Sequence, residues 1–563
     1  MTDAERRAIA PNPPMRKLIP YAMLLAFAGC GNDEEPSPDA GAGDAGPPPD
    51  AAPADAGVDA GDHDAGPPRP PARLFARRFV SKIRERPDRE SFRIGYLRAG
   101  AIMQATTAEP VRTDDPRCRG GWYELTTGGF VCNGRAVIAF WGRRPPEVRG
   151  AQPQRDDPLP YRYARNRREG NPMYRNLPTD EQAAEFEGFR IPGQEPPPAA
   201  EGEAGAEGQG APATAGNESE AAPREGASAP TEGPTEASTS AATPSEPAAE
   251  GEDAAEGEEE EEEVTLASLA GDPDSILLRR MTHGMIVSLD RDFRAGDYRR
   301  RYWRTIHNGF VPYRTLAGIN PPEFMGARLD ETTTLPIGFI LSRTENVYLR
   351  TDDGRARRGG RLDFHHRLDI VDEVTIGTTD YFIGADGRLY RQEDVREIAP
   401  AERPDEVGPN EKWIEVNLSE QYLIAYEGDR PVWATLISSG RAYHPDDPDA
   451  DFLTPTGTFR IRAKHLAANM DGDTAADGPY SIEDVPWVMY FQLAYALHGA
   501  FWHRAFGFPR SHGCVNLAPR DAQFIFNWSD PQVPSGWHGA YPTEDHPGTL
   551  IWIHGETPGQ RAR

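Results

Sequence analysis

The net charge of this 563-residue chain resides in two low-complexity tracts, which limit how much of the chain can fold. Residues 31–65 hold ten Asp and Glu and no Lys or Arg, and residues 201–263 hold nineteen Asp and Glu and one Arg. Their charges of −10 and −18 account for the whole net charge of −28. Such tracts bury too little apolar surface to form a core. We therefore expect a disordered Asp/Ala/Gly/Pro tether at 31–72 and a disordered acidic linker at 193–265.

The composition argues against two classes of protein. An acidic chain whose folded part is neutral overall lacks the positive field of a nucleic-acid-binding protein, so we expect no nucleic-acid partner. The sequence also lacks an apolar run of the roughly 20 residues that a permanent membrane span needs, which argues against a polytopic membrane protein.

The N-terminal segment carries the features of an export signal. Two basic residues precede a short apolar run, which ends in Phe-Ala-Gly before Cys30. Small residues directly before a cysteine resemble the bacterial lipobox, which implies a lipoprotein signal peptide at 1–30 and lipidation of Cys30. The alternatives are an ordinary signal peptide or a buried helix. Because Gly31 is not the Asp of the inner-membrane retention signal, we expect an exported, periplasmic protein with a lipid anchor in the outer membrane.

The remaining cysteines fit an oxidising compartment. Cys118 and Cys132 flank two segments that alternate like strands, with a Thr-Thr-Gly-Gly turn between them. A hairpin can bring the two sulfurs together, so we predict a disulfide; the alternative is two separate small core residues. Cys514 is then left unpaired, which calls for a functional explanation.

Short strand-like segments between glycine turns predict a mainly β protein. Residues 73–192 resemble a bacterial SH3-like domain in the Gly turn after Phe92 and in the Gly-Trp-Tyr-Glu-Leu strand that starts at Gly121. The same pattern recurs at 266–334 and at 335–405, which we interpret as a second and a third SH3-like unit. We expect SH3-like β-barrel units, joined by disordered acidic linkers to a β-rich C-terminal domain, and their aromatic residues as core rather than as ligand platforms.

Residues 411–556 carry the clearest structural pattern. Alternating apolar residues predict strands at 412–418, 421–426 and 431–438, and a turn followed by a strand at 454–461. Pro519 suits the first turn of a helix, and apolar residues follow it at helical spacing.

Two short motifs in this region predict nucleophilic catalysis. One is His498-Gly499, and the other runs from Ser511 through His512 and Gly513 to Cys514. A thiolate needs a neighbouring base, backbone N–H groups can hold a developing oxyanion, and a glycine before the nucleophile allows substrate to approach closely. A zinc site made of Cys514 with the nearby histidines is the alternative, although no second Cys or carboxylate stands at ligand spacing.

With the Thr-Pro-Thr-Gly-Thr-Phe segment at 454–459, these motifs make the region resemble the catalytic domain of YkuD-type L,D-transpeptidases. The resemblance covers residues 411–556 and implies a role for each motif residue. Cys514 is implied as nucleophile and His498 as general base, oriented by the backbone carbonyl of Gly499. Around them, the resemblance implies substrate-binding or oxyanion roles for Ser511, His512, Gly513, Cys514 and Asn516. Asn516 stands where many members have Arg.

The resemblance implies a peptidoglycan enzyme without a cofactor or metal. The cysteine would attack the bond between diaminopimelate and D-Ala in a tetrapeptide stem and transfer the stem to an amine. That amine would be another stem or an outer-membrane protein, giving a cross-link or a protein anchor in cell-wall biogenesis. Hydrolysis by the same cysteine, as an L,D-carboxypeptidase or endopeptidase, and a non-catalytic peptidoglycan-binding lipoprotein are the alternatives.

Further aromatic and histidine residues are interpreted more simply. Trp487, Trp502, Trp528 and Trp552 are expected in the core, with Trp502 the best candidate to line a substrate groove because it lies between the two motifs. His503 and His444 are expected at the surface.

Overall fold

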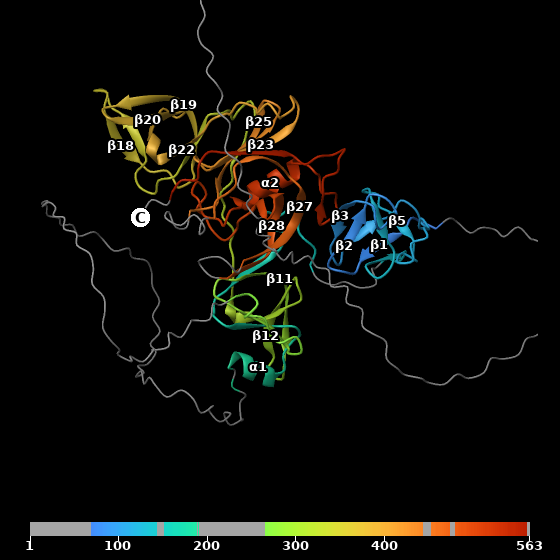
Figure 1. The fold of residues 1–563 in the computed structure, drawn as a ribbon. Coiled ribbons are helices and arrows are strands. Elements are labelled where there is room, and N and C mark those ends of the chain that lie inside the picture. The colour runs from blue at the N-terminus through green and yellow to red at the C-terminus, as the bar shows by residue number, and fades with distance from the viewer. Residues whose placement is uncertain are drawn as a thin grey trace, which may run out of the picture. The chain divides into compact units, whose positions relative to one another are not determined.

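The computed structural model describes residues 69–143, 151–188, 190, 265–442, 452–472 and 479–559 (Figure 1). The predicted signal peptide with Cys30, the tether up to residue 68, most of the acidic linker and His444 lie outside these residues. Strands predominate among the described residues, as the sequence predicts. Within them, no helix combines the length and the apolar character needed to cross a bilayer.

Seven strands form the first folded segment. β1 pairs with β4 and β7, and β2 pairs with β3 and β6. β5 and β6 form the predicted hairpin, in which Gly128 and Gly129 turn the chain at positive φ. The strands are β1 (Arg73–Ala76), β2 (Ser81–Arg84), β3 (Arg93–Leu97), β4 (Ile102–Gln104), β5 (Trp122–Glu124), β6 (Phe130–Cys132) and β7 (Val137–Phe140).

The predicted disulfide between Cys118 and Cys132 is present, with 5.7 Å between the two Cα atoms. Replacing both cysteines with serine is expected to lower the free energy of unfolding by about 3 kcal/mol, because the bond closes a loop of about fifteen residues in the unfolded chain. Denaturant unfolding of the oxidised protein and of the double variant measures this difference. Peptide mapping without reduction that recovered both cysteines as free thiols would contradict the bond.

Strands from both sides of the acidic linker pair with each other. β8 pairs with β11 and β14, and β9 pairs with β10 and β13. The sequence prediction instead separated 73–192 from 266–334. Composition misses this pairing because loop closure costs only about 0.6 kcal/mol more for each doubling of loop length, so a long insertion is tolerated between partners. The elements are β8 (Arg162–Asn166), β9 (Asn171–Tyr174), α1 (Asp180–Glu187), β10 (Leu277–Met281), β11 (Ile286–Ala295), β12 (Arg300–Thr305), β13 (Phe310–Pro312), the 3₁₀ turn η1 (Tyr313–Thr315) and β14 (Leu316–Gly318).

A seven-stranded sheet follows, in the order β18-β17-β21-β20-β19-β16-β22. Along the chain, the elements from β19 to β22 repeat the arrangement of β11 to β14: strands of 10, 6 and 3 residues, a three-residue 3₁₀ turn and a short strand. The elements are β16 (Ile337–Ile340), β17 (Val347–Arg350), β18 (Ala356–Gly360), β19 (Arg367–Ile376), β20 (Thr379–Gly384), β21 (Leu389–Arg391), η2 (Gln392–Asp394) and β22 (Val395–Ile398).

The C-terminal region contains two sheets that share strand β25. In the first, β23 pairs antiparallel with β24 and parallel with β32, and β25, β15 and β26 extend it. In the second, the end of β25 pairs with β30, and β29, β28, β27 and β31 follow. The strands are β15 (Ala327–Arg328), β23 (Lys412–Asn417), β24 (Tyr422–Glu427), β25 (Arg430–Ser438), β26 (Gly457–Arg460), β27 (Ala463–Gly472), β28 (Tyr480–Gln492), β29 (Tyr495–Gly499), β30 (Val515–Leu517), β31 (Gly539–Ala540) and β32 (Leu550–His554).

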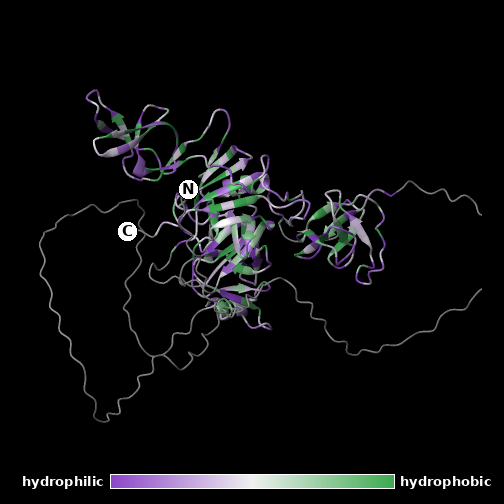
Figure 2. Ribbon diagram, turned by 45° about the horizontal axis from the view of Figure 1, so that its top comes forward, coloured by the Kyte–Doolittle hydropathy of each residue, from purple (hydrophilic) through white to green (hydrophobic). Residues whose placement is uncertain are grey.

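Helix α2 (Pro519–Trp528) forms where the sequence predicts it, with Pro519 in its first turn. Ala522, Ile525 and Phe526 lie on one face and enter the main core with strands of both sheets. The buried ammonium group of Lys464 donates to the carbonyls of Phe526 and Ser529 at the helix end. Apolar residues gather along the strands of this region in Figure 2, which agrees with a core between the sheets and α2. The packing of the helix therefore fixes the end of β30, which directly precedes it.

A buried carboxylate joins strand β28 to upstream segments. Asp484 is 1% exposed and accepts a hydrogen bond from Arg98 at 2.7 Å and another from Ser288 at 2.5 Å. Its other neighbour is His307, at 3.2 Å. The Arg98 guanidinium and these hydrogen bonds hold the pKa of Asp484 well below its usual range despite burial, so the carboxylate is charged and paired. Sequence spacing gives no signal for this contact between distant segments.

Candidate active site

The two motifs predicted to carry chemistry lie on adjacent parallel strands. β29 contains His498, and Cys514 directly precedes β30. In the register of the two strands, His498 is the partner of Asn516. Laterally paired residues send their side chains to the same face, as do residues two positions apart. His498, Asn516 and Cys514 therefore share one face of the second sheet, which we call the catalytic face.

The Cys514 thiol sits in a largely apolar setting. Cys514 is partly buried and packs against the apolar cluster that contains Val485 and Val488, and its sulfur lies 3.8 Å from the carbonyl oxygen of Ala494. Burial raises the pKa of the thiol to about 11. The resting side chain is therefore a neutral thiol at neutral pH, and it needs a base to become a nucleophile.

His498 has the geometry of such a base. It is 2% exposed, and its Nδ1 lies 3.4 Å from the carbonyl oxygen of Gly499. With the Nδ1 proton directed at that carbonyl, the lone pair of the neutral ring is on Nε2. Burial lowers the pKa of His498 to about 4, so the ring is neutral and able to accept a proton.

The loop before the cysteine is held by its own serine. The hydroxyl of Ser511 donates to the carbonyl of Cys514 and accepts the N–H of Gly513 at 3.1 Å. Gly513 has φ +111°, and a Cβ there would lie 2.4 Å from the ring of Tyr495, so only glycine fits. The N–H of Gly513, expected to face an oxyanion, is thus engaged within the loop.

Sequence reasoning missed a second brace of this loop. The hydroxyl of Thr454 accepts the N–H of Gly440 at 2.8 Å and donates to the carbonyl of Gly513 at 2.9 Å. Thr454 is 4% exposed, and it is the first residue of the predicted turn and strand at 454–461. A threonine before Pro-Thr-Gly is the available signal, but spacing alone does not tell which loop its hydroxyl contacts.

An aromatic group flanks His512. The imidazole of His512 stacks on the ring of Tyr480, with ring centroids 5.0 Å apart. The ring of Phe452 contacts the imidazole edge-on, with ring centroids 4.6 Å apart. Arg441 Nη2 lies 3.4 Å from its Nε2. His512 is therefore fixed beside the cysteine loop and belongs to the wall of the site.

The tryptophans divide between the core and the site. Trp487 is fully buried, and Trp528 and Trp552 pack against the cores, as predicted. Trp502 is partly buried and stacks on His498 with ring centroids 5.7 Å apart and an interplanar angle of 29°. This contact brings it to the catalytic face.

His503, which was expected at the surface, is partly buried. Its ring is partly buried next to Phe506 and contacts the side chain of Asn516, with His503 Nε2 and Asn516 Nδ2 3.0 Å apart. Motif spacing placed His503 in a connecting loop, but that loop folds back over the catalytic face.

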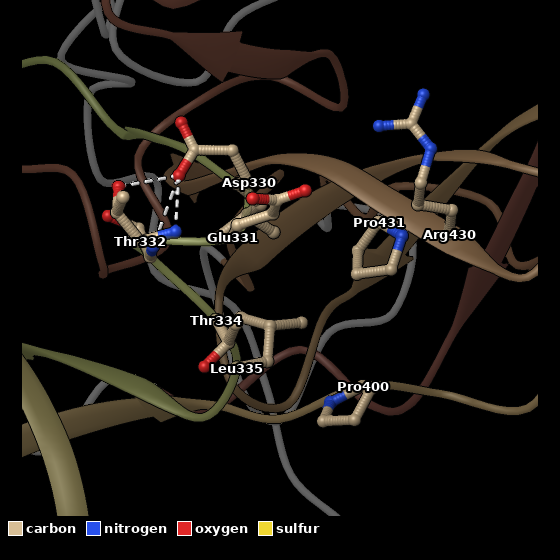
Figure 3. A pocket seen from close by; sticks show the side chains of 10 residues that line it. Asp330, Glu331, Thr332, Thr334, Leu335, Pro400, Arg430 and Pro431 are labelled. Atoms are coloured by element: carbon tan, nitrogen blue, oxygen red, sulfur yellow. Dashed lines mark hydrogen bonds between the residues drawn. The ribbon is translucent and has the colours of Figure 1, made fainter.

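A hollow of about 800 Å³ lies elsewhere, between the segment 329–335 and Pro400, Arg430 and Pro431. Figure 3 shows Asp330 turned toward Thr332, whose hydroxyl and N–H donate to it. None of its ten lining residues is a cysteine or a histidine, so it lacks a nucleophile with a base. Within the described part of the chain, no group of three or more His, Cys, Asp or Glu residues is placed to hold a metal.

Comparison with known protein families settles what this region is. Residues 411–553 match the family model of the L,D-transpeptidase catalytic domain, YkuD. This segment is a YkuD-type L,D-transpeptidase catalytic domain. The match ends three residues before the predicted boundary at 556 and covers about a quarter of the chain, so it does not describe the upstream segments. No curated protein matches the sequence.

Solved structures of three L,D-transpeptidases are similar to part of the chain. One from Enterococcus faecium is 23% identical, with a TM-score of 0.19, over 26% of this chain and 50% of that one. One from Stackebrandtia nassauensis is 19% identical, with a TM-score of 0.20, over 28% and 60% of the two chains. One from Mycobacterium smegmatis is 14% identical, with a TM-score of 0.20, over 43% and 89%. The chain thus spans about half the length of the first of these, and the assignment of the catalytic domain rests on the family model.

Proposed function

We propose that the protein is a peptidoglycan L,D-transpeptidase with Cys514 as nucleophile and His498 as general base. The observation that carries the proposal is that His498 lies in β29 and Cys514 directly precedes the adjacent parallel strand β30, inside a segment that matches the transpeptidase family. A neutral imidazole with its Nδ1 directed at a carbonyl is the state of histidine that accepts a proton.

In the proposed reaction the thiol of Cys514 attacks the carbonyl between diaminopimelate and D-Ala of a tetrapeptide stem. His498 accepts the thiol proton and returns it to the amine of the departing D-Ala, which leaves a thioester. An amine acceptor then attacks the thioester, and the resulting amide frees the thiol. Since the N–H of Gly513 is engaged by Ser511, the N–H of Cys514 is the remaining backbone donor of the expected pair for the oxyanion.

The upstream segments are proposed to be SH3-like units. Support comes from the shared plan of β11 to β14 and β19 to β22, which indicates two copies of one module. We propose that the protein is exported, anchored by a lipid on Cys30, and able to use either a stem or an outer-membrane protein as acceptor. The signal and the acidic tethers support this, as does the disulfide, which requires an oxidising compartment.

Mass spectrometry of muropeptides incubated with the purified protein tests the reaction. The proposal expects release of D-Ala and a new amide between two stems. Tripeptides without cross-links would instead indicate water as the acceptor, and unchanged tetrapeptides would contradict the proposed activity.

The pH dependence of acylation tests the proposed acid–base pair. With the pKa of His498 lowered to about 4, the imidazole stays neutral and basic well below the usual range of histidine, and with the pKa of the thiol raised to about 11 the sulfur keeps its proton in the same window. The single-turnover rate is therefore expected to be level from about pH 5 to about pH 9 and to fall on the acid side near pH 4. A half-maximal rate between about pH 6 and pH 7 would instead assign the base an ordinary histidine pKa.

A further inference from the structure

The strand that carries part of the wall of the site is also held from outside the catalytic domain. Tyr480 is the first residue of β28, and its ring stacks on that of His512 with an interplanar angle of 14°. The four residues after Tyr480 all contact upstream segments, whereas the family match begins at residue 411. Upstream segments therefore hold the part of β28 that lies next to this wall.

The first two contacts tie β28 to strands β10 and β11. The hydroxyl of Ser481 accepts a hydrogen bond from Arg279 of β10 at 3.1 Å. Ile482 is the parallel partner of Ile286, the first residue of β11. The start of β28 is thus paired with a strand that the family match does not include.

The next two contacts meet at one serine of β11. The N–H of Ser288 donates to Glu483 at 3.1 Å, and its hydroxyl donates to Asp484 at 2.5 Å. Asp484 is also bonded by Arg98, and Nε2 of His307 lies 3.2 Å from it. Ser288 and both carboxylates are each 5% exposed or less. These five residues form one buried polar group, which we call the bulge cluster.

The backbone of β28 is irregular at this cluster. Its register with β27 shifts between Ala468 and Met470, where β28 contains one residue more than β27. Asp484 lies in this bulge and has φ +53°, a conformation that a residue with a side chain keeps only where its surroundings enforce it. In a regular strand, Glu483 and Asp484 would point to opposite faces, and the bulge lets both reach Ser288. The cluster therefore fixes the bulge.

We propose that Ser288 and His307 are positioning residues of the active site. By holding the bulge of β28, they set where the ring of Tyr480 lies against His512, and so shape the wall that an acyl-donor stem contacts. The identity of the stem rests on the proposed function. The thiol and its base lie on β29 and before β30, which other contacts hold, so the cluster is expected to affect binding of the stem more than the chemical step.

Removing the Ser288 hydroxyl from the full-length protein tests the proposal. In Ser288→Ala, KM for a tetrapeptide stem is expected to rise about tenfold, the size of one hydrogen bond to a charged group, with kcat within about twofold. Alkylation of Cys514 by iodoacetamide, which needs only the thiol, should keep its rate.

The matched control for Ser288→Ala is Thr315→Val. It also removes a buried hydroxyl, whose two hydrogen-bond partners are Asn171 of β9 and Pro312 of β13 rather than β28. KM is expected to stay unchanged in this variant. An unchanged KM in Ser288→Ala, or an equal rise in Thr315→Val, would overturn the proposal.

Two substitutions of His307 separate its hydrogen bond from its packing. His307 is 24% exposed, so neither change opens the core. His307→Gln keeps an N–H donor for Asp484 and is expected to leave KM within about twofold. His307→Phe keeps a ring beside Phe79 but cannot donate, and KM is expected to rise about fivefold. The same KM in both variants would overturn the positioning role of His307.

A double-mutant cycle shows whether the cluster acts through the wall. Tyr480→Leu removes the ring that stacks on His512 and is itself expected to raise KM. Combined with Ser288→Ala, it should raise KM no further, since the positioned ring is then gone. Multiplying effects of the two changes would contradict action through Tyr480.

A measurement without substrate separates this inference from the proposed function. The ring protons of His512 face the Tyr480 ring, so their NMR signals, assigned with His512→Gln, report the stacking. We expect these signals to shift in Ser288→Ala and to stay in place in Thr315→Val. Unshifted signals in Ser288→Ala would overturn the positioning role even in a protein that acylates the stem. If the unmodified protein does not acylate the stem, the proposed function fails, while the NMR result still decides the positioning.

Discussion

Replacing Cys514 with alanine is expected to reduce acylation by a stem peptide to an undetectable level while the protein stays folded. The change removes the sulfur that forms the thioester, and no other cysteine is free among the described residues. Because the side chain is only partly buried, we expect a loss of no more than about 1 kcal/mol in the free energy of unfolding. Single-turnover acylation with denaturant unfolding of the same sample measures both quantities.

The disulfide variant is the matched control for this experiment. Cys118→Ser with Cys132→Ser should lower stability and leave the acylation rate of the folded protein intact, which is the opposite pattern. If Cys514→Ala still acylated at a measurable rate, the nucleophile would be another residue. If it unfolded, the sulfur would be a packing group.

Replacing His498 with glutamine is expected to slow acylation by about 10²-fold to 10⁴-fold, the usual contribution of a positioned general base. The buried thiol with its pKa of about 11 supplies little thiolate at neutral pH, so the reaction depends on proton transfer to this ring. Rising pH should restore part of the rate, because more of the sulfur ionises without help.

His503→Gln is the matched comparison for His498→Gln, since both remove a partly or fully buried imidazole from the same face. Its rate should stay far above that of His498→Gln at neutral pH. Equal rates of the two variants, or the reverse order, would move the base away from His498.

Sequence alone predicts the parts of the site that short motifs encode. The Cys and His motifs lie on neighbouring strands, and the helix after Pro519 forms as predicted, because apolar periodicity and proline act locally. The disulfide is predicted for the same reason, since one hairpin joins Cys118 and Cys132.

The parts that sequence missed depend on contacts between distant residues. β8 and β9 pair with strands beyond the acidic linker, and β15 joins the first sheet of the C-terminal region from outside the predicted boundary. The contact of His503 with Asn516 and the brace by Thr454 arise from how loops fold back. Such contacts are set by the tertiary structure, and neither spacing nor composition carries them.

The proposed activity requires that Cys514 forms a thioester with a peptidoglycan stem. Intact-protein mass spectrometry after mixing with a purified tetrapeptide stem tests it most directly, followed by peptide mapping of the modified residue. We predict one adduct of the stem without its terminal D-Ala, which is located on Cys514, is labile to hydroxylamine and does not form in Cys514→Ala. An adduct on another residue, or D-Ala release from Cys514→Ala at the rate of the unmodified protein, would contradict it.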